Sequence, residues 1–198
     1  MSDIAAIILA AGLSTRFNAG DAAATKLVAL WRGEPIVRCV ARNALASGAT
    51  PVVVMTGHAN RVVEQALAGL PLHVVHNNAF HEGLSSSLRA GIAALPPDVD
   101  GALAILGDMP QVRAQTLRRL MEAREAAPAN YRALIPVYGG KCGNPVLLAR
   151  RIFPDVAHLC GDEGTRTLLR ASADVVFVNV DDPGVLVDID EKDDLQRR

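Results

Sequence analysis

The sequence predicts a three-layer α/β sandwich in which helices cover both faces of a mostly parallel sheet. Two observations lead to this prediction. Short apolar runs, rich in β-branched residues, alternate with longer amphipathic segments along the whole chain. Several of these runs are apolar at consecutive positions, which is typical of strands that are buried on both faces. Strand–helix alternation of this kind favours parallel strands joined by helical crossovers, a Rossmann-like arrangement.

The first expected strand lies in an apolar run from Ile4 to Ala11 that could be mistaken for a signal peptide. No basic region precedes the run, and Gly12 and Arg16 follow it closely, so we interpret it as a buried strand. The other expected strands are short runs of similar character. The full set is Ile4–Ala10, Pro51–Thr56, His73–His76, Ala102–Leu106, Arg132–Val137 and Val175–Val180.

The expected helices lie between these strands. Pro35 suits a first helical turn, and Gly48 suits a helix end because glycine takes the left-handed cap conformation readily. The segment 138–165 breaks the alternation, and we expect an irregular excursion over the sheet edge where an acceptor could dock. We expect residues 1–198 to form a single domain. The expected helices are Pro35–Ser47, Ala59–Leu70, Ser85–Leu95, Gln115–Ala126 and Thr165–Ser172.

Composition disfavours several classes of protein. Of the 198 residues, 50% are hydrophobic and 21% are charged, which are globular proportions. The formal net charge of −1 provides no general basic surface for nucleic acid. No apolar run approaches the length that spans a bilayer. The three cysteines form no CxxC pair, which favours a cytoplasmic protein without disulfides or a zinc knuckle.

Ligands of parallel α/β sheets bind beyond the carboxyl ends of the strands, which directs attention to three segments, Ala10–Lys26, Thr56–His58 and Gly107–Pro110, and to the first above all. Its small residues Ala10, Ala11 and Gly12 would let backbone N–H groups approach a phosphate chain. Arg16 and Lys26 would add positive charge. The segment matches neither GxGxxG nor GxxxxGK[ST]. Taken alone, it could equally be a tight turn that serves packing.

Acidic residues at two other places suggest a metal site. Asp108 follows the fourth expected strand, where a carboxylate could hold Mg²⁺, although a Gly-Asp pair also suits a simple turn. Near the end of the chain, Asp188 and Asp190 would share one face of an extended segment, with Ile189 on the other. Asp190 could instead cap the last helix, with Asp193 three residues further on.

Taken in order, these segments carry a resemblance to a known family. The quoted motifs are LAAG-x-S-x-R, a later Lys, SSLRAG, LGDMP, GNPVLL, GDEGTR and DID. Together they resemble the molybdenum-cofactor nucleotidyltransferases, within the wider group similar to the molybdopterin-guanine-dinucleotide enzyme. The likeness covers nearly the whole chain, and LAAG with GNPVLL favours the cytidylyltransferase branch.

The resemblance implies a fold of the nucleotide-diphospho-sugar transferase type and a set of site residues. Mg²⁺, with Mn²⁺ as an alternative, would be held by Asp108 together with Asp190 or Asp188. Arg16, Lys26 and Asp108 would act in catalysis. The nucleotide would contact Leu9, Ala10, Ala11, Gly12, Arg16, Lys26, Ser86, Ser87 and Asp108. The acceptor would contact Asn144, Asp162 and Arg166.

The sequence also departs from the family pattern. The family commonly has Arg-Met-Gly and then Lys a few residues later, whereas here Phe17 follows Arg16 and Lys26 comes ten residues after Arg16. The last acidic motif reads Asp-Glu-Lys-Asp-Asp where the family often has Asp-Thr-Pro-Glu-Asp.

The reaction implied by the resemblance is transfer of CMP from CTP to the phosphate of molybdopterin, with release of pyrophosphate. The molybdoenzyme that receives the product would be a further partner, and neither nucleic acid nor a membrane is expected. Guanylyl transfer to molybdopterin and nucleotidyl transfer to a sugar phosphate remain alternatives. A carrier or insertion chaperone for molybdenum cofactor, without catalysis, is an alternative of another class. A nicotinamide-dependent oxidoreductase is disfavoured because GxGxxG is absent.

Overall fold

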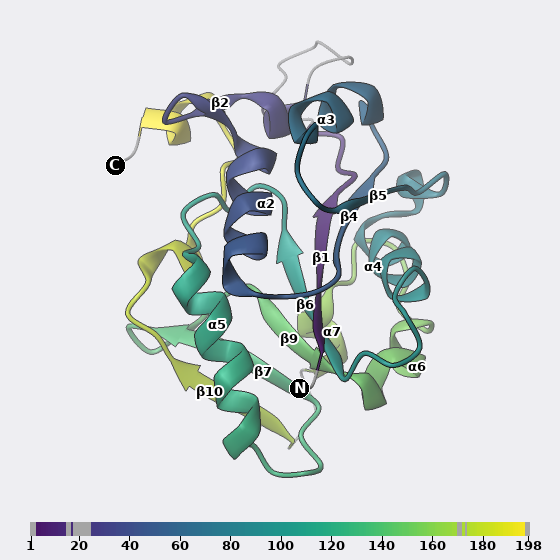
Figure 1. Ribbon diagram of the computed structural model, residues 1–198, viewed down its shortest axis with the longest axis vertical. Helices are drawn as coiled ribbons and strands as arrows, with labels where there is room; N and C mark the ends of the chain where they lie inside the picture. The colour runs from purple at the N-terminus through teal and green to yellow at the C-terminus, as the bar shows by residue number, and fades with distance from the viewer. Residues whose placement is uncertain (1–2, 15–16, 18–24, 170–171, 173, 197–198) are drawn as a thin grey trace.

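The computed structural model describes residues 3–14, 17, 25–169, 172 and 174–196. Its centre is an eight-stranded sheet in the order β10-β7-β9-β6-β1-β4-β5, with β8 paired to β7 (Figure 1). All the expected strands form, with ends within one residue of those expected. The strands are β1 (Ile4–Ala10), β4 (Val52–Thr56), β5 (His73–His76), β6 (Gly101–Leu106), β7 (Ala133–Tyr138), β8 (Lys141–Cys142), β9 (Val146–Ala149) and β10 (Val175–Asn179).

The sheet is mostly parallel, as predicted. Strand β1 runs parallel to β4 and β6, and β10 runs parallel to β7. Strand β9 lies antiparallel between β6 and β7. The expectation of an irregular excursion over 138–165 is therefore wrong for Val146–Ala149, whose side chains are all buried inside the sheet. The four apolar residues between Pro145 and Arg150 are too few to show the periodicity of a strand. The strand is recognised only from its pairing with neighbouring strands in the sheet.

Strand β1 separates two hydrophobic cores. Its side chains alternate between the faces of the sheet, so that Ile8 contributes to one core and Ile7 to the other. The first core also contains side chains of α2, α3 and α5, and the second contains side chains of α4, α6 and α7. These two helical layers and the sheet between them confirm the predicted three-layer architecture (Figure 1). The helices are α2 (Ile36–Ser47), α3 (Asn60–Leu67), α4 (Leu84–Ala93), α5 (Ala114–Ala123), α6 (Phe153–Val156) and α7 (Thr165–Leu169).

Helix boundaries follow the local chemistry. Gly48 ends α2 with φ of 89°, the left-handed conformation expected of it. Pro35 is the residue before α2 rather than part of its first turn. It belongs instead to the small antiparallel pair β2 (Leu30–Trp31) and β3 (Glu34–Pro35), which the sequence pattern did not reveal. Within the described part of the chain, no helix combines the length and the apolar character that crossing a bilayer would require.

The order of the strands determines where a ligand can bind. From β1 the chain moves to β4 and β5 on one side, and then returns to place β6 on the other side of β1. The chain therefore continues from β1 toward β4 and from β6 toward β7, which lie on opposite sides of this strand pair, through α2 and α5 on the same face of the sheet. Such a reversal opens a crevice at the carboxyl ends of the two strands, the usual ligand site of open α/β sheets.

Candidate active site

The loops after β1 and β6 meet at this crevice. The Gly107 amide donates to the Leu9 carbonyl at 3.0 Å, which continues the pairing of the two strands beyond their ends. A Cβ on residue 107 would lie 2.9 Å from the Leu9 carbonyl oxygen, so glycine is needed for this approach. The close contact brings Asp108, the next residue, directly against the loop after β1.

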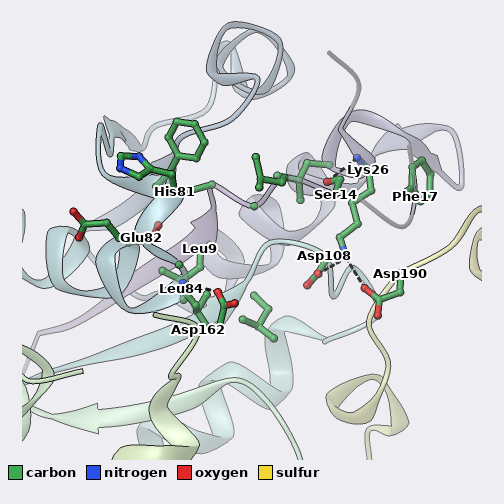
Figure 2. Close-up of a pocket in the computed structure, with 18 of the residues that line it drawn as sticks. Leu9, Ser14, Phe17, Lys26, His81, Glu82, Leu84, Asp108, Asp162 and Asp190 are labelled. Carbon is green, nitrogen blue, oxygen red and sulfur yellow. Dashed lines mark hydrogen bonds and ion pairs between the residues drawn. The ribbon is translucent and has the colours of Figure 1, made fainter. Parts of the chain in front are cut away.

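A cavity of about 570 Å³, called the first cavity below, opens at this point. It is enclosed by the loop after β1, the segment 80–84 and the acidic residues (Figure 2). Ala10 does not line it, because its side chain is fully buried in the core, and Ser86 is also absent from the lining. Arg16 lies outside the described residues. The predicted nucleotide-binding residues that do line the cavity are Leu9, Ala11, Gly12, Lys26, Ser87 and Asp108.

Lys26 extends into the acidic part of this cavity. Its Nζ lies 2.7 Å from Asp108 Oδ2 and 2.8 Å from Asp190 Oδ1 (Figure 2). Its backbone position is determined locally: the Lys26 amide donates to Ser14 Oγ at 3.2 Å, and the Thr25 side chain caps the short helix η1 (Lys26–Val28). The long loop before Lys26 therefore does not remove this residue from the site.

The electrostatics of the site favour an additional cation. Burial raises the pKa of Asp108 above its ordinary value, although the Lys26 ammonium opposes the rise. For Lys26, burial lowers the pKa, but Asp108 and Asp190 outweigh burial and the net shift is upward. Both directions follow from placing carboxylates around one ammonium group in a partly dry pocket.

Three carboxylates converge at this place, those of Asp108, Asp188 and Asp190. One ligand oxygen from each lies within 4.8 Å of the others. Asp108 Oδ1 is buried and has no hydrogen-bond partner among the described residues. Ile189, between the two tail aspartates, is 1% exposed and points away from them, as predicted. This set of oxygens has the chemistry that Mg²⁺ and Mn²⁺ prefer.

The tail is held in place by two kinds of contact. The Ile189 amide donates to the Asp108 carbonyl at 3.0 Å, and the Ile189 side chain packs with Phe17, Trp31 and Ile36. The Asp194 carboxylate accepts from the Asp190 amide at 3.0 Å, so it is not merely a solvated charge. Trp31 is a packing residue of this small cluster, which links the loop after β1 to the tail.

The start of α4 carries a network that sequence reasoning missed. Asn77 Nδ2 donates to Ser86 Oγ at 2.9 Å and to Ser87 Oγ at 3.1 Å, and all three side chains are buried. Ser86 also donates to the Gly83 carbonyl at 2.8 Å. Ser86 therefore supports the structure of the helix start, while Ser87 lines the cavity. Asn77 directly follows β5, a position where a polar residue could have been noticed.

A second cavity, of about 690 Å³, adjoins the first. The predicted acceptor residues Asn144 and Arg166 line it, and Asp188 lies at its edge toward the acidic cluster. Asp162 lines both cavities, and its Oδ1 accepts from the Leu84 amide at 3.3 Å at the start of α4. The acidic cluster thus stands between the two cavities.

Comparison with known proteins agrees with this geometry. A family model described as the MobA-like NTP transferase domain matches residues 6–176. The chain belongs to the MobA-like NTP transferase family. The description of this family names NTP transfer.

Two curated relatives align with different shares of this chain and of their own length. The molybdenum cofactor cytidylyltransferase of Escherichia coli strain K12 is 25% identical over 195 residues, which are 98% of this chain and 94% of that protein. The bifunctional protein GlmU of Anaeromyxobacter sp. strain K is 36% identical over 129 residues. These are 64% of this chain and 26% of GlmU, so the match spans about a quarter of that relative.

Solved structures resemble the MobA-like protein over its whole length. The crystal structure of Rv0371c from Mycobacterium tuberculosis is 28% identical, with a TM-score of 0.86 over 99% of this chain and 96% of that one. A second crystal structure of Rv0371c is a complex with manganese, at a TM-score of 0.82 over 99% and 97% of the two chains. These likenesses confirm the predicted fold of the nucleotide-diphospho-sugar transferase type.

Proposed function

We propose that the protein transfers CMP from CTP to the phosphate of molybdopterin and releases pyrophosphate. The observation that carries this proposal is the acidic cluster between two cavities. Asp108 and Asp190 line the first cavity, and Asp188 lines the second. A triphosphate in the first cavity and an acceptor phosphate in the second would therefore meet at these carboxylates. The likeness to a molybdenum cofactor cytidylyltransferase over 98% of the chain supports the choice of both substrates.

The lining of the second cavity supports a flat, partly apolar acceptor with additional polar groups. Its apolar part includes Leu88, Met109 and Leu186, and two cations, Lys141 and Arg166, lie among its polar lining. An apolar wall gains free energy by covering the face of a fused heterocycle. A sugar phosphate, with hydroxyls on both faces, would leave much of this wall without a suitable partner.

Mg²⁺, or Mn²⁺ in its place, would be held by Asp108, Asp188 and Asp190. The fit rests on their convergence and on the buried, unpartnered Asp108 Oδ1. A divalent ion at this position would polarise the α-phosphate and neutralise charge that develops on it. The same carboxylates are positioned by backbone contacts of the tail, so the site is largely formed before substrate arrives.

The protein's own groups bind and orient the reactants. In the proposed step an oxygen of the acceptor phosphate forms a bond to the α-phosphorus, and the bond from that phosphorus to the bridging oxygen of pyrophosphate breaks. A phosphate monoester with a second pKa of about 6 is mostly the dianion at neutral pH, so the nucleophile needs no strong general base. Lys26 would stabilise the departing pyrophosphate, as would Arg16, whose role remains a prediction from the sequence.

A pyrophosphate-release assay tests this function. The purified protein is supplied with molybdopterin and, in separate reactions, with CTP, GTP, ATP or UTP, in Mg²⁺ or Mn²⁺. We expect turnover to be fastest with CTP. Absence of pyrophosphate release with molybdopterin and every triphosphate would refute the proposal and support a carrier role.

A sugar phosphate is the second candidate acceptor, because the identity to GlmU is 36% over the matched residues. Parallel reactions with a sugar 1-phosphate separate the two. Turnover with the sugar phosphate and none with molybdopterin would assign the second cavity to a sugar. The dependence on Asp108 should be the same in either case.

A further inference from the structure

The position of the Lys26 ammonium group has a consequence for how metal and nucleotide bind. It contacts carboxylate oxygens of two of the three residues that would hold the metal, at 2.7 and 2.8 Å. A magnesium ion lies about 2.0–2.1 Å from its oxygen ligands. Asp108 Oδ1 has no hydrogen-bond partner among the described residues, but an ion bound there would share the Asp108 carboxylate with the ammonium group. The two positive charges repel each other strongly at this short distance.

The two partners differ in how readily they can move. The backbone that bears the carboxylates is held in place, because the Ile189 amide donates to the Asp108 carbonyl and the Asp190 amide donates to the Asp194 carboxylate. Lys26 reaches them through a flexible four-carbon stem. When a metal ion arrives, the lysine side chain is therefore the group that moves.

The first cavity provides a destination for the displaced ammonium. Lys26 lines this cavity together with Gly12 and Ser14 of the loop after β1. Among the described residues that line it, Lys26 is the only lysine or arginine. A triphosphate bound there carries several negative charges, which the released ammonium can meet at short range.

We propose that Lys26 neutralises the metal-binding carboxylates in the nucleotide-free protein and passes to the triphosphate when the divalent ion binds. The inference rests on the proposed nucleotide site in the first cavity. It makes Lys26 a competitor of the metal when nucleotide is absent and a link between metal and nucleotide when both are present. The coupling is reciprocal, so each ligand strengthens binding of the other.

A titration with Mn²⁺ in the absence of acceptor tests this inference. Isothermal calorimetry or electron paramagnetic resonance would measure Mn²⁺ binding to the nucleotide-free wild type, to Lys26→Met and to Lys141→Met. Lys141 lines the second cavity and is exposed, so its variant is the matched control. We expect Lys26→Met to bind Mn²⁺ about tenfold more tightly than the wild type, within the usual range of coupling between sites, and Lys141→Met to match the wild type.

The same variants are then titrated with CTP, with and without Mn²⁺. We expect Mn²⁺ to strengthen CTP binding to the wild type and to Lys141→Met, and to strengthen it much less for Lys26→Met. Equal or weaker Mn²⁺ binding by a folded Lys26→Met, verified by thermal unfolding, would overturn the inference. Asp108→Asn, which removes a ligand, should weaken Mn²⁺ binding in every background. Failure of pyrophosphate release with molybdopterin would not affect these titrations, because no acceptor is present.

Discussion

The two cavities are built in different ways, and the difference separates two parts of the proposed reaction. The first cavity lies at the ends of the parallel strands β1 and β6 and combines backbone of the loop after β1 with Lys26 and three aspartates. The second cavity takes Lys141, Cys142 and Asn144 from the hairpin segment around β8 and β9, together with Arg166. In the proposed reaction, phosphate chemistry would therefore depend on the parallel part of the sheet, and acceptor choice on the antiparallel insertion.

The acidic cluster is common to both cavities, so its loss should have the largest effect. We expect Asp108→Asn to lower kcat about 10³-fold or more, because the charge that holds the metal and orients the α-phosphate is lost. Pyrophosphate release under saturating substrates is the measurement. Asp193→Asn, at an exposed position, is the control and should keep full activity. Activity of Asp108→Asn near that of the control would remove the cluster from the reaction.

Loss of the hydrophobic packing beneath the acidic cluster should have the next largest effect. Ile189→Ala removes buried atoms from contact with Phe17, Trp31 and Ile36, and we expect the free energy of unfolding to fall by about 2–5 kcal/mol. The flanking aspartates should also lose their fixed spacing, so that kcat falls more than the KM for CTP rises. Ile189→Val is the milder control, with a loss of about 1 kcal/mol.

Denaturant unfolding and steady-state kinetics measure the two effects of Ile189→Ala. Trp31, the only tryptophan, provides a fluorescence signal from the same cluster. A variant that is destabilised but retains the wild-type kcat and Mn²⁺ affinity would show that the cluster stabilises the fold without positioning the carboxylates.

A change in the second cavity should alter acceptor binding alone. We expect Arg166→Ala to raise the KM for the acceptor about tenfold, the loss of roughly one charge-assisted hydrogen bond, and to leave the KM for CTP unchanged. Arg119→Ala, exposed on α5, controls for loss of an arginine. Equal increases in both KM values would contradict the separation of the cavities.

Thiol labelling tests whether the acceptor binds in the second cavity. It needs no substitution, so it disturbs the protein least. Burial, with Glu34 adding to it, raises the pKa of Cys39 to about 11, whereas Cys142 and Cys160 are exposed. Since the thiolate is the reactive form, we expect two thiols to react quickly at pH 8 and Cys39 slowly. Mass spectrometry after brief alkylation identifies them. Bound acceptor should protect Cys142, and CTP alone should not. Protection of Cys142 by CTP alone would contradict the assignment of the cavities.

Elements whose pattern is local could be predicted from the sequence alone. The strands of the parallel half, their helices and the glycine end of α2 follow from apolar periodicity and cap chemistry, which act within a few residues. Asp108 at a strand end, and the opposite orientation of Ile189 relative to its neighbours, were predictable for the same reason. Lys26 was predicted as a cation of the segment after the first strand, and the motif order that resembles a family added its catalytic role.

Which distant groups meet depends on the packing of the whole chain and could not be predicted. The insertion of β9 between β6 and β7 depends on hydrogen bonds to strands far away in the chain, and four apolar residues do not reveal it. The convergence of Lys26 with Asp108 and Asp190 joins segments separated by up to 164 residues, and the burial of Ala10 and Ser86 depends on how layers pack. Side-chain periodicity records which face a residue occupies, but contacts across the sheet depend on strand order, which local patterns do not contain.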